Sequence, residues 1–283
     1  MIMTQIKTVL LLGLLAGILM LIGYSFGGTM GLTIAFAFAI LINFGMYWFS
    51  DKMVLAMYKA KPITKKDAPK IYELVEEVAR EAHMPMPKVY EIPSDNPNAF
   101  ATGRNKDHAV VAVTAGILKI LTRYELKGVI AHEFSHIKNK DMLITTIAAT
   151  IATVISYLAA MARFAAIFGG ARDDSRGAGD LISIIVLSIM TPIMAMFIQL
   201  AISRSREYLA DETGAKIVRN PNHLADALEK LESASARHPM RMGNQATSSL
   251  FIVNPFKGMS ILNLLSTHPP VKERIKRLRE MRI

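Results

Sequence analysis

Forty-three consecutive residues, from Thr8 to Ser50, carry no charged side chain, and few folds accommodate so long an uncharged stretch. A helix crosses the hydrocarbon of a bilayer with about 20 apolar residues, so the stretch is long enough for two crossings. Adjacent glycines near its middle allow a tight turn. We therefore expect two transmembrane helices within residues 8–50, at about 8–24 and 30–48. A cleaved signal peptide is the alternative for the first, although a second apolar span follows almost at once.

Two further uncharged runs occur later, 21 residues from Met142 to Ala162 and 23 residues from Leu181 to Ser203. The polar, glycine-rich stretch 169–180 separates them, and Pro192 can kink the second. We expect residues 142–203 to form two more membrane segments joined by a short polar turn. The lengths also allow a shallow hairpin that does not cross fully.

The basic residues predict how the chain is oriented. Fifteen Lys and Arg residues lie in 51–141 and fourteen in 204–283, whereas the turn between the later runs has two against three aspartates. Cytoplasmic loops are enriched in Lys and Arg. We expect a multi-pass protein of the inner (cytoplasmic) membrane with both termini in the cytoplasm. The net charge of +10 then reflects the bilayer and not nucleic acid, since basic and aromatic residues are not interleaved.

The two charged segments, 51–141 and 204–283, are expected to form one discontinuous cytoplasmic domain. Its periodicity predicts a mostly helical α+β fold. The expected strands are 88–92 and 108–113, and the expected helices are 67–81, 124–138, 205–218, 223–235 and 271–281, with Asn222 as the cap of the fourth.

The run His132-Glu133-Phe134-Ser135-His136 lies in one of these helices. Two histidines four residues apart project from one helix face, so both imidazoles can reach one metal ion. The glutamate between them can act as a base on a nearby water, which is the H-E-x-x-H arrangement of zinc peptidases. The chain has no cysteine, so the remaining protein ligands must be His, Asp or Glu. We predict one Zn²⁺ per chain, with Glu133 as general base.

A third ligand is needed, because catalytic zinc usually has three protein ligands and one open position. Glu207 is the best candidate, and Asp211 on the same helix face can accept a hydrogen bond from a ligand histidine. His136 comes six residues before the uncharged run that begins at Met142, and we expect one continuous helix to join them. Glu207 comes four residues after the run that ends at Ser203. Both halves of the site would then lie near the same membrane surface.

These motifs resemble those of the HtpX-type membrane zinc metalloproteases, relatives of the CAAX prenyl proteases. The resemblance covers most of the chain: two apolar segments, the motif from Ala131 to Asn139, two more apolar segments, and Arg-x-x-Glu-x-x-Ala-Asp from Arg204 to Asp211. Asn98-Ala99-Phe100-Ala101-Thr102-Gly103 is similar to the strand that lines the cleft in that family. Thr267-His268-Pro269-Pro270, with Arg274, is similar to its C-terminal His-Pro motif.

The resemblance implies a gluzincin-like peptidase domain that cleaves misfolded or damaged membrane proteins, in stress response and protein quality control. It nominates His268 as catalytic, a partner for the oxyanion with Arg274 nearby, and Asn98 as part of a strand that pairs with substrate. The alternatives are that His268 caps a helix and that Asn98 lies in an ordinary turn. Arg204 would brace the carboxylates or hold a lipid phosphate.

A different class of function is a membrane scaffold with no catalytic activity. The intact Glu133 argues against it, since a scaffold needs no base between the ligands. An intramembrane protease is also disfavoured, because Glu125, Lys127 and Lys138 flank the histidines and are costly in hydrocarbon. Polypeptide substrates and the lipid bilayer are the expected partners, whereas the pattern predicts no particular oligomeric state.

Overall fold

The computed structural model describes residues 51–103, 105–169, 178–237, 252 and 268–283, and positions 10, 11, 14, 18, 28–30, 33, 36, 37, 41, 45, 48 and 49. The expected spans at 8–24 and 30–48, and the polar turn between the later runs, therefore lie largely outside the described residues. The chain divides into two compact units, of which one contains 48–143 and 203–283 and the other contains 2–47 and 144–202.

The first unit is built on a four-stranded sheet with the order β1-β2-β4-β3. Strand β2 (Lys88–Ile92) is parallel to β4 (Val110–Thr114) and pairs Lys88 with Val110. The edge strands β1 (Lys61–Pro62) and β3 (Ala99–Thr102) are antiparallel to their neighbours. The predicted strand 88–92 is confirmed, and the strand expected at 108–113 is displaced by one or two residues. Residues 99–102 form strand β3, so the segment after Asn98 is a strand and not the ordinary turn that was the alternative.

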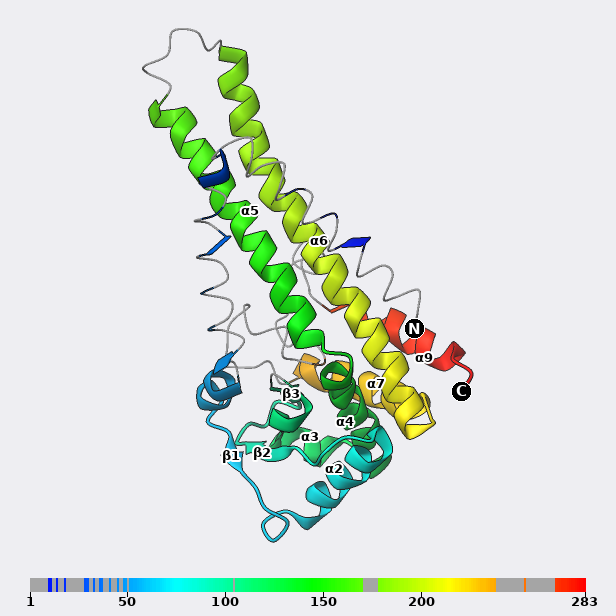
Figure 1. Cartoon of the computed structure of the whole chain (residues 1–283). Helices are drawn as coiled ribbons and strands as arrows, with labels where there is room; N and C mark the ends of the chain where they lie inside the picture. Colours follow the sequence, from blue (N-terminus) through cyan, green and yellow to red (C-terminus); the bar gives the residue numbers. More distant parts are fainter. Residues whose placement is uncertain are drawn as a thin grey trace. The chain divides into compact units, whose positions relative to one another are not determined.

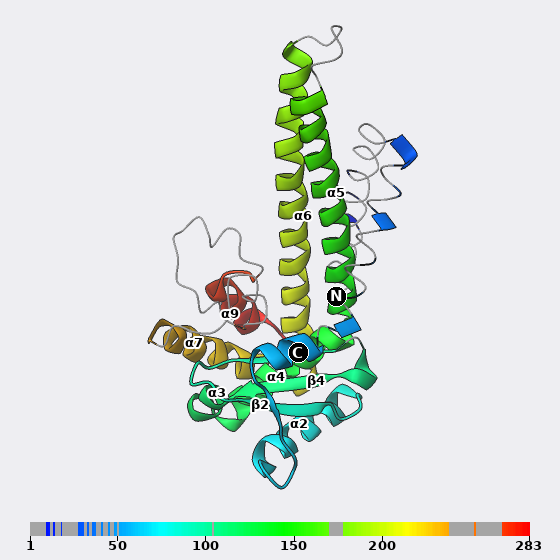
Figure 2. The same ribbon diagram turned by 90° about the vertical axis from the view of Figure 1, so that its left-hand side faces the viewer.

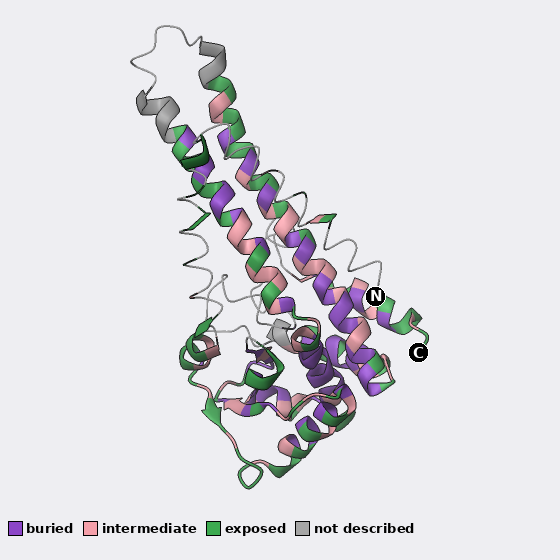
Figure 3. Ribbon diagram, in the orientation of Figure 1, coloured by how far each residue is buried: buried purple, intermediate pink, exposed green. Residues whose placement is uncertain are grey.

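The same unit contains the helices α2 (Pro69–Ala82), α3 (Ala115–Ile120), α4 (Arg123–Lys138), α7 (Asn222–Arg237) and α9 (Val271–Glu280) (Figure 2). Helix α4 packs against α2, α7 and β3, and residues 128–135 are all buried (Figure 3). Its start is fixed by a capping box in which Thr122 and Glu125 bond each other's backbone N–H. A helix so placed can hold functional side chains in the protein interior.

Helix α2 has the apolar face that its sequence predicts. The apolar side chains expected on one face, Ile71, Leu74, Val75 and Val78, are all at most 4% exposed and belong to the core of this unit. Asn222, expected to cap α7, is instead its first residue. The side-chain oxygen of Asn222 accepts a hydrogen bond from Arg279 in α9.

Two long helices, α5 (Asp141–Gly169) and α6 (Ala178–Val218), run side by side (Figure 1). Both are long and apolar enough to cross a membrane, over residues 141–163 and 182–218. Many of their large apolar side chains are exposed, among them Tyr157, Ile182 and Phe197. Of the described residues, these are the parts that fit a bilayer by length and composition.

Two expectations about these helices need correction. The uncharged run ending at Ser203 and the helix predicted from residue 205 are one continuous helix of 41 residues, since no residue after Pro192 interrupts it. The helix expected to continue from His136 into the next apolar run is broken instead. Helix α4 ends at Lys138, and Lys140 has a left-handed backbone (φ 56°) that turns the chain before α5 begins.

Candidate metal centre

Helix α4 brings the two predicted histidines together on one buried face. His132 is 1% exposed and Glu133 is 5% exposed. The imidazole rings of His132 and His136 are nearly perpendicular, with centroids 4.7 Å apart. Their Nε2 atoms are 3.2 Å apart, which is the convergence expected for positions i and i+4 of a helix.

Glu207 reaches the same point from α6. Its Oε2 lies 3.6 Å from His132 Nε2, and its Oε1 lies 3.6 Å from His136 Nε2. One ligand atom from each of the three residues falls within 4.8 Å of the others. The close approach depends on Gly214, because a Cβ there would lie 2.9 Å from the backbone nitrogen of His132. Two nitrogens and one carboxylate oxygen are a donor set that suits zinc.

Each histidine has a carboxylate at its other ring nitrogen. His136 Nδ1 lies 2.8 Å from Asp141 Oδ2, and His132 Nδ1 lies 3.0 Å from Asp211 Oδ1, the second pair without the alignment of a hydrogen bond. A carboxylate accepts only, so a hydrogen is held on Nδ1 and the lone pair of a neutral ring is left on Nε2. This arrangement orients both Nε2 atoms toward a common cation.

The charges around the histidines favour a cation at this point. Burial alone lowers the pKa of each ring, but neighbouring carboxylates outweigh it. Glu207, Asp141 and Glu133 raise the pKa of His136 to about 10, and Asp211 and Glu207 raise the pKa of His132. The surroundings therefore stabilise positive charge between the rings, which fits the binding of a metal dication.

Arg274 and His268 come from the C-terminal segment. Arg274 is 0% exposed and donates to both oxygens of Asp211, at 2.9 and 2.7 Å. A third donor, Nη1, reaches the carbonyl of Ile252 at 3.2 Å. His268 Nδ1 lies 3.0 Å from Glu207 Oε2. The structure thus brings both residues of the expected His-Pro motif to the centre, with Arg274 directed at Asp211.

Strand β3 borders the centre on the side of Glu133. The backbone N–H of Ala101 donates to Glu133 Oε2 at 2.9 Å. Asn98 is buried, and its side-chain oxygen accepts from the backbone N–H of Ile252 at 3.2 Å. The predicted Asn98 is therefore next to the site, where its side chain holds a backbone segment.

The predicted residue Arg204 lies on the same helix as Glu207. It is half-buried in α6, three residues before Glu207. Its neighbour Arg206, which our sequence reasoning missed, donates through Nε to Asp141 and through Nη2 to the carbonyl of Asn139 at 2.9 Å. Asp141 was missed as well, because a continuous helix would have carried it away from His136.

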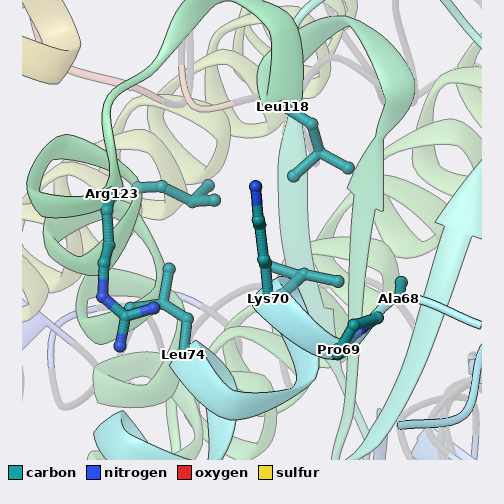
Figure 4. Close-up of a pocket in the computed structure, with 8 residues that line it drawn as sticks. Ala68, Pro69, Lys70, Leu74, Leu118 and Arg123 are labelled. Atoms are coloured by element: carbon teal, nitrogen blue, oxygen red, sulfur yellow. The ribbon is translucent and has the colours of Figure 1, made fainter. Parts of the chain in front are cut away.

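A cavity of about 480 Å³ lies elsewhere on this unit (Figure 4). It lies between α2, α3 and α4, and its lining is mainly apolar, including Ile71, Leu74 and Leu118, with Lys70 and Arg123 as its charged members. No metal-centre residue lines it, so we place the functional site at the histidines and Glu207.

Comparison with known proteins agrees with this geometry. A model of peptidase family M48 matches residues 65–282. The chain belongs to peptidase family M48. It is 53% identical over 280 residues to a protease HtpX homolog of Syntrophobacter fumaroxidans, covering 98% of this chain and 99% of the relative. A homolog from Persephonella marina is 56% identical over 282 residues, covering 99% and 98%.

The fold of the M48 chain also resembles a solved structure. The crystal structure of S. mikatae Ste24p aligns with a TM-score of 0.60 at 20% identity, over 98% of this chain and 66% of that chain. At this identity the likeness shows the fold alone. The predicted resemblance to HtpX-type proteases and the predicted class, a membrane metalloprotease, are confirmed, and family membership implies a metal ion.

Proposed function

We propose that this M48 peptidase is a zinc endopeptidase that holds one Zn²⁺ between His132, His136 and Glu207. The observation that carries the proposal is the convergence of three ligand atoms within 4.8 Å, with a carboxylate behind each histidine. When bound, the metal supplies Lewis acidity toward water and toward a peptide carbonyl. Every further step is the work of side chains and backbone groups of this chain.

Glu133 is the general base of the proposed reaction. It takes a proton from the attacking water and delivers it to the nitrogen of the leaving amine, so the peptide C–N bond breaks as the new C–O bond is kept. The Ala101 N–H, 2.9 Å away, fixes one oxygen of the carboxylate. The other oxygen is left for proton transfer.

His268 is the proposed partner of the developing oxyanion. Its Nδ1 faces Glu207, which holds a hydrogen on that nitrogen. The imidazolium form is the one assigned to this role, because both of its ring nitrogens donate and Nε2 is then directed at substrate. Arg274 supports the site through Asp211, and Asp211 in turn orients His132. We assign Arg274 to this bracing role and the oxyanion contact to His268 alone.

Substrate binds as an extended strand along β3. The strand lies at the edge of the sheet, so its outer backbone groups, apart from the Ala101 N–H that is bonded to Glu133, can pair with a polypeptide of any sequence. Asn98, directly before β3, holds the backbone of Ile252 through its side-chain oxygen. Such backbone pairing suits unfolded segments, which are the parts of damaged proteins that a protease can reach.

The proposed setting is the cell membrane, crossed by two segments within 8–50 and two within 142–203. Residues 51–141 and 204–283 then form the cytoplasmic peptidase domain, which acts on misfolded or damaged membrane proteins. Arg204 directly follows the uncharged part of α6, where an arginine suits a lipid phosphate. Arg206 and Arg274 donate to carboxylates of the site.

The test compares wild type with Glu133→Ala, both purified without metal in detergent, before and after zinc is added, with an unfolded protein as substrate. We expect wild type and Glu133→Ala to bind zinc equally. Of these two proteins, only wild type should cleave the substrate, and only after zinc is added. Glu73→Ala, an exposed glutamate of α2, serves as the matched control and should cut like wild type. Cleavage by Glu133→Ala at the wild-type rate would refute the assignment of the base.

A further inference from the structure

The second histidine, His136, has a partner that no motif pointed to. Asp141, the first residue of α5, reaches back across the turn at Lys140 and places Oδ2 2.8 Å from His136 Nδ1. Its other oxygen, Oδ1, accepts from Arg206 in α6. The carboxylate therefore links a histidine of α4 with an arginine next to Glu207.

This link is buried, which separates it from the ion pairs on the surface. The side chains of Asp141 and Arg206 are 6% and 4% exposed. Arg206 also donates to the carbonyl of Asn139, so it holds both the carboxylate and the backbone of the turn before α5. A buried carboxylate held from two sides has one orientation, and it imposes that orientation on the imidazole.

The arrangement matches the one at the other histidine. There a buried arginine, Arg274, holds Asp211, which faces His132. At both histidines the order is arginine, aspartate, imidazole, but the residues come from different elements. The contact between His136 and Asp141 is better aligned than the contact between His132 and Asp211, since only Nδ1 of His136 forms a hydrogen bond with its carboxylate.

We propose that Asp141 and Arg206 are a positioning pair that orients His136 for metal binding. The inference rests on the proposed zinc site. Without Asp141, the ring of His136 is free to rotate and to place its hydrogen on Nε2, which removes the lone pair from the site. Without Arg206, Asp141 loses the donor that fixes its orientation, and the effect on His136 is smaller.

A purely structural reading is that the pair only ties the start of α5 to α6. That reading predicts a loss of thermal stability and no change in how the folded protein binds metal. The two readings therefore differ in the zinc dissociation constant and in the visible spectrum of the cobalt-substituted protein, which reports the geometry around the ion.

The experiment uses the full chain in detergent, with zinc affinity measured by competition with a chelator and the Co²⁺ absorption spectrum recorded for each variant. We expect Asp141→Ala to raise the zinc Kd about 10- to 100-fold, as losses behind a ligand histidine generally do. Asp141→Asn should bind more tightly than Asp141→Ala, because its amide oxygen still accepts from Nδ1. Arg206→Gln should also weaken zinc binding.

Two controls break ion pairs of the same kinds on the surface. Asp226→Asn removes one acidic partner of Arg279, and Lys216→Gln removes a basic partner of Glu212 on α6. Both should keep the zinc Kd within about twofold of wild type. If Asp141→Ala does not fold, Arg206→Gln decides the question by the same measurements.

A wild-type Kd and a wild-type Co²⁺ spectrum in Asp141→Ala, or in Arg206→Gln if Asp141→Ala does not fold, would overturn the inference, whatever the melting temperatures. That result would leave the proposed function intact, because wild type would still bind zinc and cleave. Failure of wild type itself to bind zinc would instead refute the proposed function, and the inference with it.

Discussion

Ala101 contributes to the site through its main chain alone. In an antiparallel pair, consecutive residues direct their backbone groups alternately toward and away from the neighbouring strand. Asn98 accepts from the Thr114 N–H of β4, so Ala101, three residues on, faces away from β4. Its N–H is therefore available to Glu133 without loss of a bond within the sheet.

Replacing Ala101 with proline removes this one donor. A hydrogen bond to a charged group is worth about 1.5–3 kcal/mol, so we expect kcat to fall about 10- to 100-fold for Ala101→Pro, with an unchanged zinc Kd. Ala101→Gly keeps the N–H and serves as the control, with nearly wild-type kcat. Equal kcat in the two variants would show that the bond does not matter.

The residues of the site differed in how well sequence could predict them. His132 and His136 are four apart in one helix, so spacing alone places them together, and Glu207 was found from its motif and its position after an apolar run. Asp141 could not be predicted, because its carboxylate reaches His136 only through the left-handed turn at Lys140. A lysine in that conformation has no signature in the sequence, unlike glycine.

At the scale of the elements, helix α4 makes close contacts with α7 and with α6, and a glycine lies at each contact. A Cβ on Gly128 would lie 2.6 Å from the Leu224 nitrogen of α7, and one on Gly214 of α6 would lie 2.9 Å from the His132 nitrogen of α4. Contacts this short with backbone atoms cannot be relieved by a side-chain rotation. Either substitution must move a helix.

We expect Gly128→Ala and Gly214→Ala each to lower the free energy of unfolding by roughly 1–3 kcal/mol, the usual effect of overpacking. Only Gly214→Ala moves α6 away from His132, so it alone should raise the zinc Kd, by roughly tenfold. Thermal melts and chelator competition on both variants provide the comparison. A raised Kd in Gly128→Ala would mean that the effect is general and not local to α6.

Helices α2 and α4 are joined by a cluster of ion pairs. Lys127 lies 2.7 Å from Glu77 and 2.8 Å from Glu81, and Arg123 lies 2.6 Å from Glu77. The hydrogen bond from Lys127, against a smaller opposing effect of burial, lowers the pKa of Glu77 below its ordinary 4.5. A lowered pKa in the folded state means that the cluster stabilises the fold when Glu77 is ionised.

Glu77→Gln should therefore lower the melting temperature at neutral pH, by an amount equivalent to about 1 kcal/mol or less. The difference from wild type should stay constant above pH 4.5 and shrink as the pH falls through the lowered pKa, where wild type loses the same charge. Glu73→Gln on the exposed face of α2 is the control. A difference that persists in acid would point to packing instead.

Elements with one apolar face were predicted from their own periodicity, whereas the strand at β3 was expected from the family resemblance alone. Helix α2 and strand β2 follow from their own periodicity. The four-residue β3 is too short for a reliable pattern, and it exists because it pairs with β4. The continuity of α6 was missed, because the charges after Ser203 suggested a new element where the helix continues unchanged.

For the molecule as a whole, the main expectation is topological. Four crossings place 51–141 and 204–283 on one side of the membrane and the polar stretch between α5 and α6 on the other. The chain has no cysteine, so a single introduced cysteine is an unambiguous reporter. Lys88 and Lys276 are exposed, and Ser175 lies in the polar stretch.

We expect Lys88→Cys and Lys276→Cys to react with a membrane-impermeant thiol reagent only when the cytoplasmic face is accessible, as in inverted vesicles. Ser175→Cys should react only from outside. Labelling of all three from the same side would show that the later segments form a shallow hairpin, and the peptidase domain would then need a different account of its anchoring.

Arg274 has a consequence for the time at which the protein becomes active. It is the last residue of the proposed centre along the chain, 142 residues after His132. Arg274 holds Asp211, which in turn faces His132. Synthesis proceeds from the N-terminus, so the metal ligands leave the ribosome before the residue that braces them. On this assignment, a nascent or prematurely terminated chain that lacks Arg274 carries the three ligands but not the arginine that holds Asp211 in place.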